Sequence, residues 1–288
     1  MEDFGKTKPT PPITHPKPIF QQASVDGHRA LWVVTILMLV SSLIFYGMSA
    51  RAPVQKRLVP ILMSLVTTIS FISYLAMATG DGRTYNHVHR HHHHDYIPDT
   101  MKLVLREVYW ARFVNWILTS PLILIILSLQ GGLNGAGMLV AIAADIIMFL
   151  TALIASFIGG NGRKWMWYTI SCLAYLTVVY QLGYRGRRAV ANKNAQTRRF
   201  FSTLTSYSLI LLLIYPIIWA AGTLARKISV DSEIIVFLIL DVLSQGIFGY
   251  WILFAHDRSP ALAVPVDGFW SNGLTGEGEI RVGEDENA

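Results

Sequence analysis

Residues 109–130 read YWARFVNWILTSPLILIILSLQ, and this stretch decides the fold of the chain. It is long enough to cross the hydrocarbon core of a bilayer, which takes about 20 mostly apolar residues in a helix. It also holds polar groups at helical spacing, which line one stripe of the helix. They are Arg112, Asn115, Trp116, Thr119 and Ser120. Because a charge inside a membrane is costly and usually functional, we predict a membrane-spanning helix whose polar face is turned toward protein.

Six further apolar stretches accompany it, at about residues 30–50, 58–79, 136–158, 165–184, 200–224 and 233–256. The 288 residues are 52% hydrophobic and 15% charged, whereas a typical soluble domain has about 25% charged residues. This composition argues against a soluble enzyme, a nucleic-acid-binding protein and a disordered protein. The predicted fold class is all-α, a bundle of seven transmembrane helices.

The two ends of the chain differ from the apolar middle. Residues 1–28 are polar and rich in proline, and residues 259–288 carry six acidic side chains against one basic side chain after position 266. Such compositions favour disordered, solvated tails. We therefore predict a disordered N-terminal tail over 1–28, a membrane domain over 29–258 and an acidic disordered tail over 259–288.

Basic residues between the predicted spans indicate the orientation in the membrane. The loop between the fifth and sixth spans holds Arg185, Arg187, Arg188, Lys193, Arg198 and Arg199, and the loop between the first and second holds Arg51, Lys56 and Arg57. Short loops rich in Lys and Arg usually face the cytoplasm. This rule predicts an outer N-terminus and a cytoplasmic C-terminus.

Two further carboxyl groups fall inside predicted spans, Asp145 and Asp241. Asp241 is a candidate counter-ion for Arg112, and Gln245 shares its helix face at i+4. Asp145 is expected to hydrogen-bond to a neighbour and to be protonated, since burial disfavours the charged carboxylate. For each group the alternative is a structural pair that only fixes helix packing, because an unpaired buried charge would be expensive.

Five segments of the chain, one in each of five spans, resemble helices of the microbial rhodopsins. Residues 112–122 resemble the third helix of that family, 215–219 the sixth, 240–249 the seventh, 74–77 the second and 145–148 the fourth. The resemblance implies the seven-helix rhodopsin fold, with a short β-hairpin in the loop between the second and third helices. It also implies a pocket frame made of Tyr74, Arg112, Trp116, Met148, Tyr215, Trp219 and Asp241.

The departures from the family concern the positions that carry its photochemistry. The resemblance implies a lysine that binds retinal as a Schiff base, and that position is Gln245 here. Because an amide nitrogen is not a nucleophile for an aldehyde, we expect no covalent retinal. The position of the primary proton acceptor is Asn115, which cannot take up a proton near neutral pH, and that of the inner proton donor is Ile126. We therefore expect no light-driven proton pumping.

This combination resembles the fungal opsin-related proteins, which include the small heat-shock membrane protein of yeast and share the fold without the lysine. The resemblance implies a stress-responsive protein of the plasma membrane that restrains the proton-pumping ATPase. It implies no enzymatic activity and no cofactor. The lipid bilayer and the ATPase are the expected partners, nucleic acid is not, and the formation of homo-oligomers stays open.

A histidine-rich loop follows the second span and reads HVHRHHHHD over residues 87–95. On a strand, His87, His89, His91 and His93 would point to one side. Neutral imidazoles bind Zn²⁺, Ni²⁺ or Cu²⁺, and they titrate between about pH 5 and 8. The loop is a candidate metal or pH sensor, and the alternative is a low-complexity loop that binds metal adventitiously.

Two other functions remain open beside the regulator. Arg112, Asp145, Asp241 and Glu233 could line the polar path of an ion channel or transporter. Alternatively, an aromatic frame could enclose a ligand without a covalent bond; it consists of Tyr74, Trp116, Tyr215 and Trp219. The residues and the resemblance together favour the non-photochemical regulator.

Overall fold

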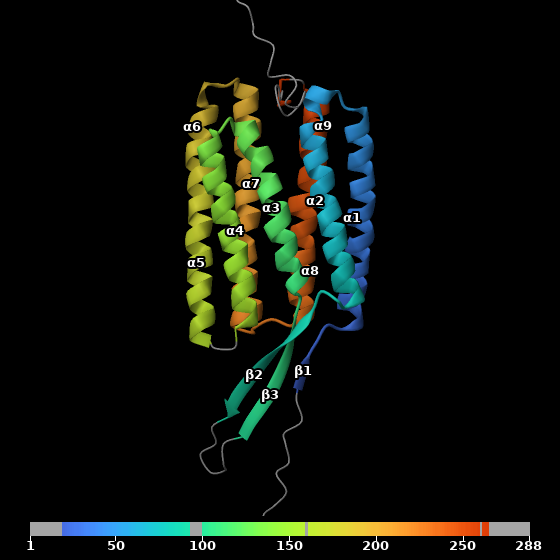
Figure 1. The fold of residues 1–288 in the computed structure, drawn as a ribbon, viewed down its shortest axis with the longest axis vertical. Coiled ribbons are helices and arrows are strands. Elements are labelled where there is room, and N and C mark those ends of the chain that lie inside the picture. The colour runs from blue at the N-terminus through green and yellow to red at the C-terminus, as the bar shows by residue number, and fades with distance from the viewer. Residues whose placement is uncertain (1–18, 93–99, 159–160, 260, 265–288) are drawn as a thin grey trace, which may run out of the picture.

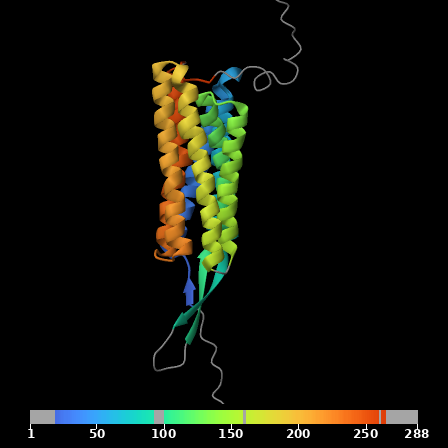
Figure 2. The same ribbon diagram turned by 90° about the vertical axis from the view of Figure 1, so that its left-hand side faces the viewer.

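The computed structural model describes residues 19–92, 100–158, 161–259 and 261–264, without the side chains of 87–92, 100–103 and 161. Seven helical rods lie side by side and form one bundle (Figure 1). After a quarter turn the rods remain roughly parallel, and a small sheet extends beyond one end (Figure 2). This architecture confirms the predicted seven-helix bundle.

The first four rods are continuous helices. They are α1 (Val25–Arg51), α2 (Leu58–Thr79), α3 (Trp110–Gly131) and α4 (Gly135–Phe157), with a single 3-10 turn, η1 (Val54–Lys56), between the first two. The Ser24 side chain caps α1 by accepting from the backbone N–H groups of Asp26 and Gly27, as serine commonly does. Gly80 ends α2 with a φ of 95°, a conformation that glycine adopts without strain.

The last three rods are interrupted by π-helical turns. The fifth consists of α5 (Asn161–Val179), η2 (Tyr180–Gly186) and α6 (Arg187–Ala189), followed by the 3-10 turn η3 (Val190–Asn192). The sixth consists of α7 (Ala195–Trp219) and η4 (Ala220–Leu224), and the seventh of α8 (Val230–Asp241), η5 (Val242–Ile247) and α9 (Phe248–Arg258). Such π turns are frequent at functional sites, and η5 contains Gln245.

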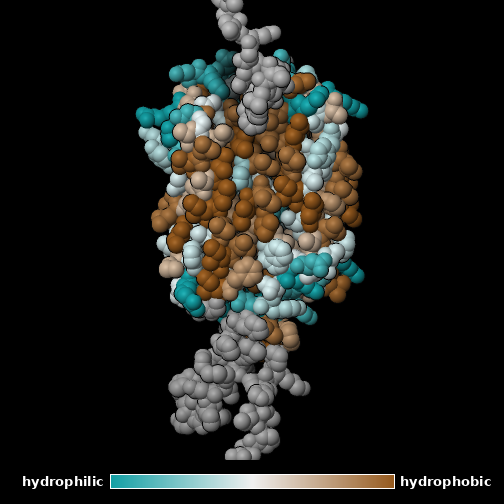
Figure 3. Space-filling model, in the orientation of Figure 1, coloured by the Kyte–Doolittle hydropathy of each residue, from teal (hydrophilic) through white to brown (hydrophobic). Residues whose placement is uncertain are grey.

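On the face drawn in Figure 3, an apolar belt lies between two hydrophilic ends of the bundle. Within the described ranges, six rods are long and apolar enough to cross a membrane. The fifth rod falls outside that set: α5 begins with the polar residues Asn161–Lys164, and the predicted stretch 165–184 continues from α5 into η2. We conclude that the protein is a multi-pass membrane protein.

The small sheet has three strands, β1 (Ile19–Gln21), β2 (Thr84–His92) and β3 (Thr100–Val108), in the order β1-β3-β2. Strands β2 and β3 are antiparallel, with Tyr85 opposite Glu107, which confirms the expected hairpin. Strand β1 pairs with β3 in parallel. Strand β1 lies within the range 1–28, which the composition predicts to be disordered. The strand was not predicted because its backbone pairs with residues more than 80 positions away, and no local sequence pattern indicates such a partner.

Candidate ligand pocket

Asp241 is the centre of a fully buried hydrogen-bond cluster in the middle of the bundle. Trp116 Nε1 on α3 donates to its Oδ1 at 2.8 Å, and Tyr215 Oη on α7 donates to the same oxygen at 2.6 Å. Tyr74 Oη on α2 donates to Oδ2. Three helices thus supply donors to one carboxylate of α8. Because buried polar atoms need hydrogen-bond partners, these donors hold the Asp241 carboxyl group in place.

A second polar network lies one helical turn further along, around Gln245. The Ser70 hydroxyl on α2 contacts Gln245 Oε1, and it also lies 3.1 Å from Asn115 Oδ1. Gln245 Nε2 donates to Thr119 Oγ1 at 3.3 Å. The Nδ2 group of Asn115 is buried and has no hydrogen-bond partner among the described residues. Because an unsatisfied buried donor is costly, this N–H group is available to an acceptor on a ligand.

Aromatic rings form the wall beside these two networks. The ring of Trp116 lies 4.8 Å from Tyr215, 5.4 Å from Phe149 and 5.1 Å from Phe237, measured between centroids. Two small cavities adjoin this wall, of about 50 and 20 Å³, and both are lined by Trp116, Phe149 and Tyr215. The larger one reaches Gln245, and the smaller one reaches Trp219. Together they form an interrupted pocket that runs from a polar end to an aromatic end.

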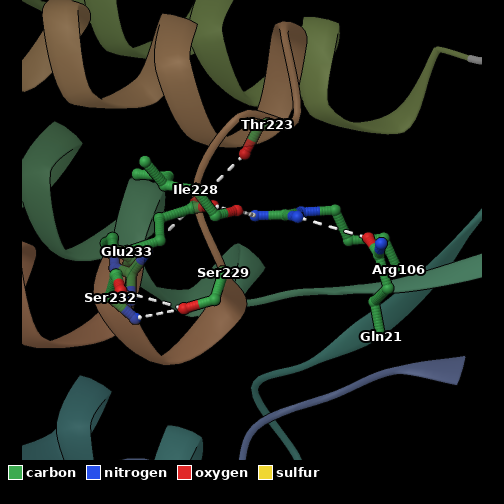
Figure 4. Close-up of polar contacts among 8 residues, drawn as sticks. Gln21, Arg106, Thr223, Ile228, Ser229, Ser232 and Glu233 are labelled. Carbon is green, nitrogen blue, oxygen red and sulfur yellow. Dashed lines mark hydrogen bonds and ion pairs between the residues drawn. The ribbon is translucent and has the colours of Figure 1, made fainter.

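Arg112 is not paired with Asp241, contrary to our expectation. Its Nη1 lies 3.7 Å from Glu233 Oε1, and its guanidinium carbon lies 4.6 Å from the centroid of the Phe237 ring. Glu233 also forms an ion pair of 2.8 Å with Arg106 Nη2 (Figure 4). The carboxylate at the start of α8 is therefore closer to Arg112 than Asp241 is, and Asp241 receives uncharged donors instead.

Figure 4 shows the side chain of Arg106 extended between Gln21 and Glu233. Arg106 Nη2 also donates to the carbonyl of Ile228 at 3.2 Å, and Thr223 Oγ1 donates to Glu233 Oε1 at 3.1 Å. This cluster ties β1, β3, η4 and α8 together at the sheet end of the bundle. Arg106 and Glu233 are buried. Their ion pair therefore stabilises the sheet end of the bundle only while both side chains are present, because either charge alone would be buried without a partner.

Asp145 on α4 has the neighbour that we predicted. Ser120 Oγ on α3 donates to Asp145 Oδ1 at 2.8 Å, and the carboxyl group is fully buried. Met148, one turn further along α4, lines the smaller cavity. Asp145 lines neither cavity and, among the interactions of the described residues, has no contact with the Asp241 cluster.

In the described part of the chain, no residue that lines the two cavities comes from the histidine loop. His87, His89 and His91 lie on the backbone of β2, opposite Leu105, Leu103 and Met101. Their side chains, and all of His93, lie outside the described residues. The described part of the chain contains no cluster of three metal-ligating side chains. The metal or pH role of this loop stays a prediction.

The structure brings Tyr74, Trp116 and Tyr215 of the predicted frame together at Asp241, and two further residues of these networks were not predicted from the sequence. Ser70 joins Gln245 to Asn115, and Arg106 provides the ion pair of Glu233. Ser70 lies four residues before Tyr74, on the same helix face, and this spacing was a usable signal. Arg106 lies on a strand outside the predicted spans, and nothing in its local sequence indicated a buried partner.

Comparison with known proteins places these features in a family. The model of a protein family described as "Bacteriorhodopsin-like protein" matches residues 28–258 of this chain. Opsin-1 of Neurospora crassa is 41% identical over 280 residues, which are 96% of this chain and 92% of that protein. A light-driven proton pump of Leptosphaeria maculans has 42% identity and a TM-score of 0.82, over 85% of this chain and all of the other. The light-driven proton pump of Coccomyxa subellipsoidea has 27% identity and a TM-score of 0.75, over 82% and 100%.

These relatives correct two of our expectations. The non-photochemical regulator of a proton ATPase is wrong, because the similar proteins are an opsin and light-driven proton pumps. The expectation of a protein without retinal is contradicted by the same findings. Both expectations extended the chemistry of a few positions, Gln245, Asn115 and Ile126, to the function of the whole protein, whereas the similarity covers almost the entire chain.

The residue at position 245 nevertheless differs chemically from a lysine. Its amide is hydrogen-bonded on both sides, to Ser70 and Thr119. The lysines with described side chains, Lys56, Lys164, Lys193 and Lys227, lie at or beyond the ends of the rods. Gln245 itself does not fit a covalent link to an aldehyde, because its amide nitrogen is not a nucleophile.

The match over residues 28–258, the identity to an opsin and the shared fold show that this chain belongs to the bacteriorhodopsin-like family, the microbial rhodopsins.

Proposed function

We propose that this protein is an opsin of a cellular membrane that binds a retinal-type polyene in the pocket beside Trp116 and Tyr215. The observation that carries the proposal is the arrangement around Asp241, where donors from three helices meet one carboxyl group beside an aromatic wall. The similarity to an opsin and to light-driven proton pumps supports it. We regard the protein as a binding protein rather than an enzyme.

The two ends of the pocket suit the two ends of such a ligand. Aromatic and apolar side chains favour the chain and ring of a polyene. At the other end, the free N–H of Asn115 and the amide of Gln245 suit a carbonyl oxygen. The two cavities share Trp116, Phe149 and Tyr215 in their linings, so a ligand that occupies both lies against this wall. Gln245 is also our reason to group this chain with the fungal opsin-related proteins.

The test is to add all-trans-retinal to the purified full-length protein and to measure the retinal that stays bound after gel filtration. We expect one retinal per chain for the wild type and a clear loss for Trp116→Ala, because the substitution removes the shared wall. The matched control is Trp32→Ala, which removes an exposed tryptophan of α1. Equal retention by all three proteins, or none by the wild type, would refute the pocket.

A second variant tests the geometry at position 245. Gln245→Lys places a primary amine where the family has one, so we expect retinal to form a pigment that absorbs in the visible range. Gln245→Met, which has similar length and no amine, is the control and is not expected to form the pigment. Absence of a visible band in Gln245→Lys would mean that the polar end of the pocket does not lie at this residue.

We also propose that the protein lies in the plasma membrane with the N-terminus outside. The basic residues of the two loops that end α1 and follow η2 support this orientation, because such loops usually stay in the cytoplasm. Epitope tags at either terminus, probed in intact and permeabilised cells, test it. We expect the N-terminal tag to react in intact cells and the C-terminal tag only after permeabilisation; the reverse pattern would invert the orientation.

A further inference from the structure

A cavity of about 400 Å³ lies at the end of the bundle opposite the sheet. It opens between the end of α1, the turn η1 and the end of α9. Its volume is in the range of small-molecule sites, about 300–1,000 Å³. The cavity is distinct from the pocket at Asp241, since the two share no lining residue.

One wall of this cavity is a short segment after α9, residues 261–264, held by specific contacts. Gln130 Nε2 donates to the carbonyl of Leu262 at 3.1 Å, and Thr197 Oγ1 donates to the carbonyl of Ala261 at 3.3 Å. The side chain of Leu262 is buried. Gln130 Oε1 lies 3.1 Å from His256 Nε2, so the same glutamine connects the segment to α9. The wall is therefore fixed by tertiary contacts.

The lining of the cavity combines two cations with an apolar surface. Arg51 and Lys56 are exposed at its edge, and Asp257 is the one carboxylate among its lining residues. Val59 and Leu253 are among the apolar residues inside. The helix ends that surround it lie where the apolar belt gives way to the hydrophilic band (Figure 3). A site of this kind matches a molecule with an anionic head and an apolar chain.

We propose that this cavity binds the headgroup of an anionic phospholipid, with the phosphate at Arg51 and Lys56 and an acyl chain along Val59 and Leu253. Basic pockets between transmembrane helices bind anionic headgroups in other membrane proteins. The chemistry of a phosphate is shared by free phosphate and by a lipid. The apolar wall distinguishes them, because free phosphate gains nothing from it.

Native mass spectrometry of the full-length protein in detergent tests the proposal, with phosphatidylglycerol as the probe and phosphatidylcholine as the neutral comparison. We expect preferential binding of phosphatidylglycerol. The double variant Arg51→Gln/Lys56→Gln should weaken it at least about tenfold, since each basic residue near an anionic surface contributes about 1 kcal/mol. Ala263→Trp, which fills the cavity from the segment 261–264, should also weaken it without any change of charge.

The matched control is Arg198→Gln/Arg199→Gln, which removes the same charge from exposed residues at the same end of the bundle and outside the cavity lining. We expect it to bind phosphatidylglycerol like the wild type. Equal weakening by both double variants would show that general surface charge attracts the lipid, and would overturn the proposal. Displacement of the lipid by an excess of inorganic phosphate, or unchanged binding by Ala263→Trp, would overturn the part played by the apolar wall.

Discussion

Tyr215 Oη donates to Asp241 Oδ1 at 2.6 Å and lies 2.9 Å from Ser244 Oγ. One phenol therefore connects α7 to both α8 and the π turn that follows it.

Tyr215→Phe should destabilise the protein by about 1–3 kcal/mol, because Asp241 loses a buried donor. The measurement is the midpoint of thermal unfolding in detergent. Tyr180→Phe is the control, since that ring is half exposed on the outside of the bundle; equal midpoints for the two variants would contradict this role.

The Arg106–Glu233 ion pair should be far more sensitive to substitution than an exposed pair. Its side chains are 4% and 11% exposed. Glu233→Gln should cost about 3–5 kcal/mol, because it leaves Arg106 buried and uncompensated. The double variant Arg106→Gln/Glu233→Gln should recover part of that loss. Arg29→Gln breaks a pair whose side chains are 76% and 84% exposed, and should cost about 1 kcal/mol or less. A double-mutant cycle without coupling would disprove the pair's contribution.

Lys164 should make the stability of the protein depend on pH. Burial, with Arg226 and Arg106 as neighbouring charges, lowers the pKa of Lys164 from 10.5 to about 8. Below pH 8 the amine is protonated in both states. Between about pH 8 and 10.5 the unfolded chain holds more protons than the folded one, so stability rises with pH. The unfolding midpoint should rise over this range.

Lys164→Met should raise the midpoint at pH 7 and abolish that rise, because it removes the buried ammonium group. Lys227→Met, at an exposed position, should leave the rise intact. A wild-type midpoint that stays level between pH 8 and 10, or the same change in both variants, would speak against the assignment to Lys164.

Two glycines should respond in opposite directions to alanine. At Gly82 an added Cβ would lie 2.7 Å from the Cβ of Ala111 and 3.1 Å from the backbone of Ala76. Gly82→Ala should therefore cost about 1–3 kcal/mol through overpacking. At Gly47, inside α1, an added Cβ meets nothing within 4 Å, and Gly47→Ala should stabilise the helix by about 0.5–1 kcal/mol. Thermal unfolding of both variants checks the signs; a loss at Gly47 would contradict the open space there.

Much of the fold could be predicted because it depends on local composition. An apolar stretch long enough to span the bilayer predicts a helix, because the bilayer core has no water to hydrogen-bond the backbone groups. Helix α2 matches its predicted span, residues 58–79, at both ends. The hairpin followed from the family resemblance. The pairing of Ile19 with Val104 could not be predicted, because strand partners distant in sequence leave no local pattern.

The candidate site shows the same division. The spacing of Asn115 and Thr119 placed them on one face of α3, and that face does point to Gln245. The link through Ser70 depends on how α2 is rotated against η5, which a single helix does not specify. The functional expectation was wrong because it inferred the activity of the whole protein from the departures at Gln245, Asn115 and Ile126.

The amino-acid sequence by itself determined the membrane spans, the residue types at the buried positions and the family resemblance, because these follow from hydropathy, helical periodicity and short motifs. Only the tertiary structure decided which charges meet. Arg112 is within 3.7 Å of Glu233 instead of pairing with Asp241, although both carboxylates lie on the same rod. The physical reason is that periodicity assigns a residue to a helix face, whereas the rotation and axial offset of neighbouring helices determine its partner.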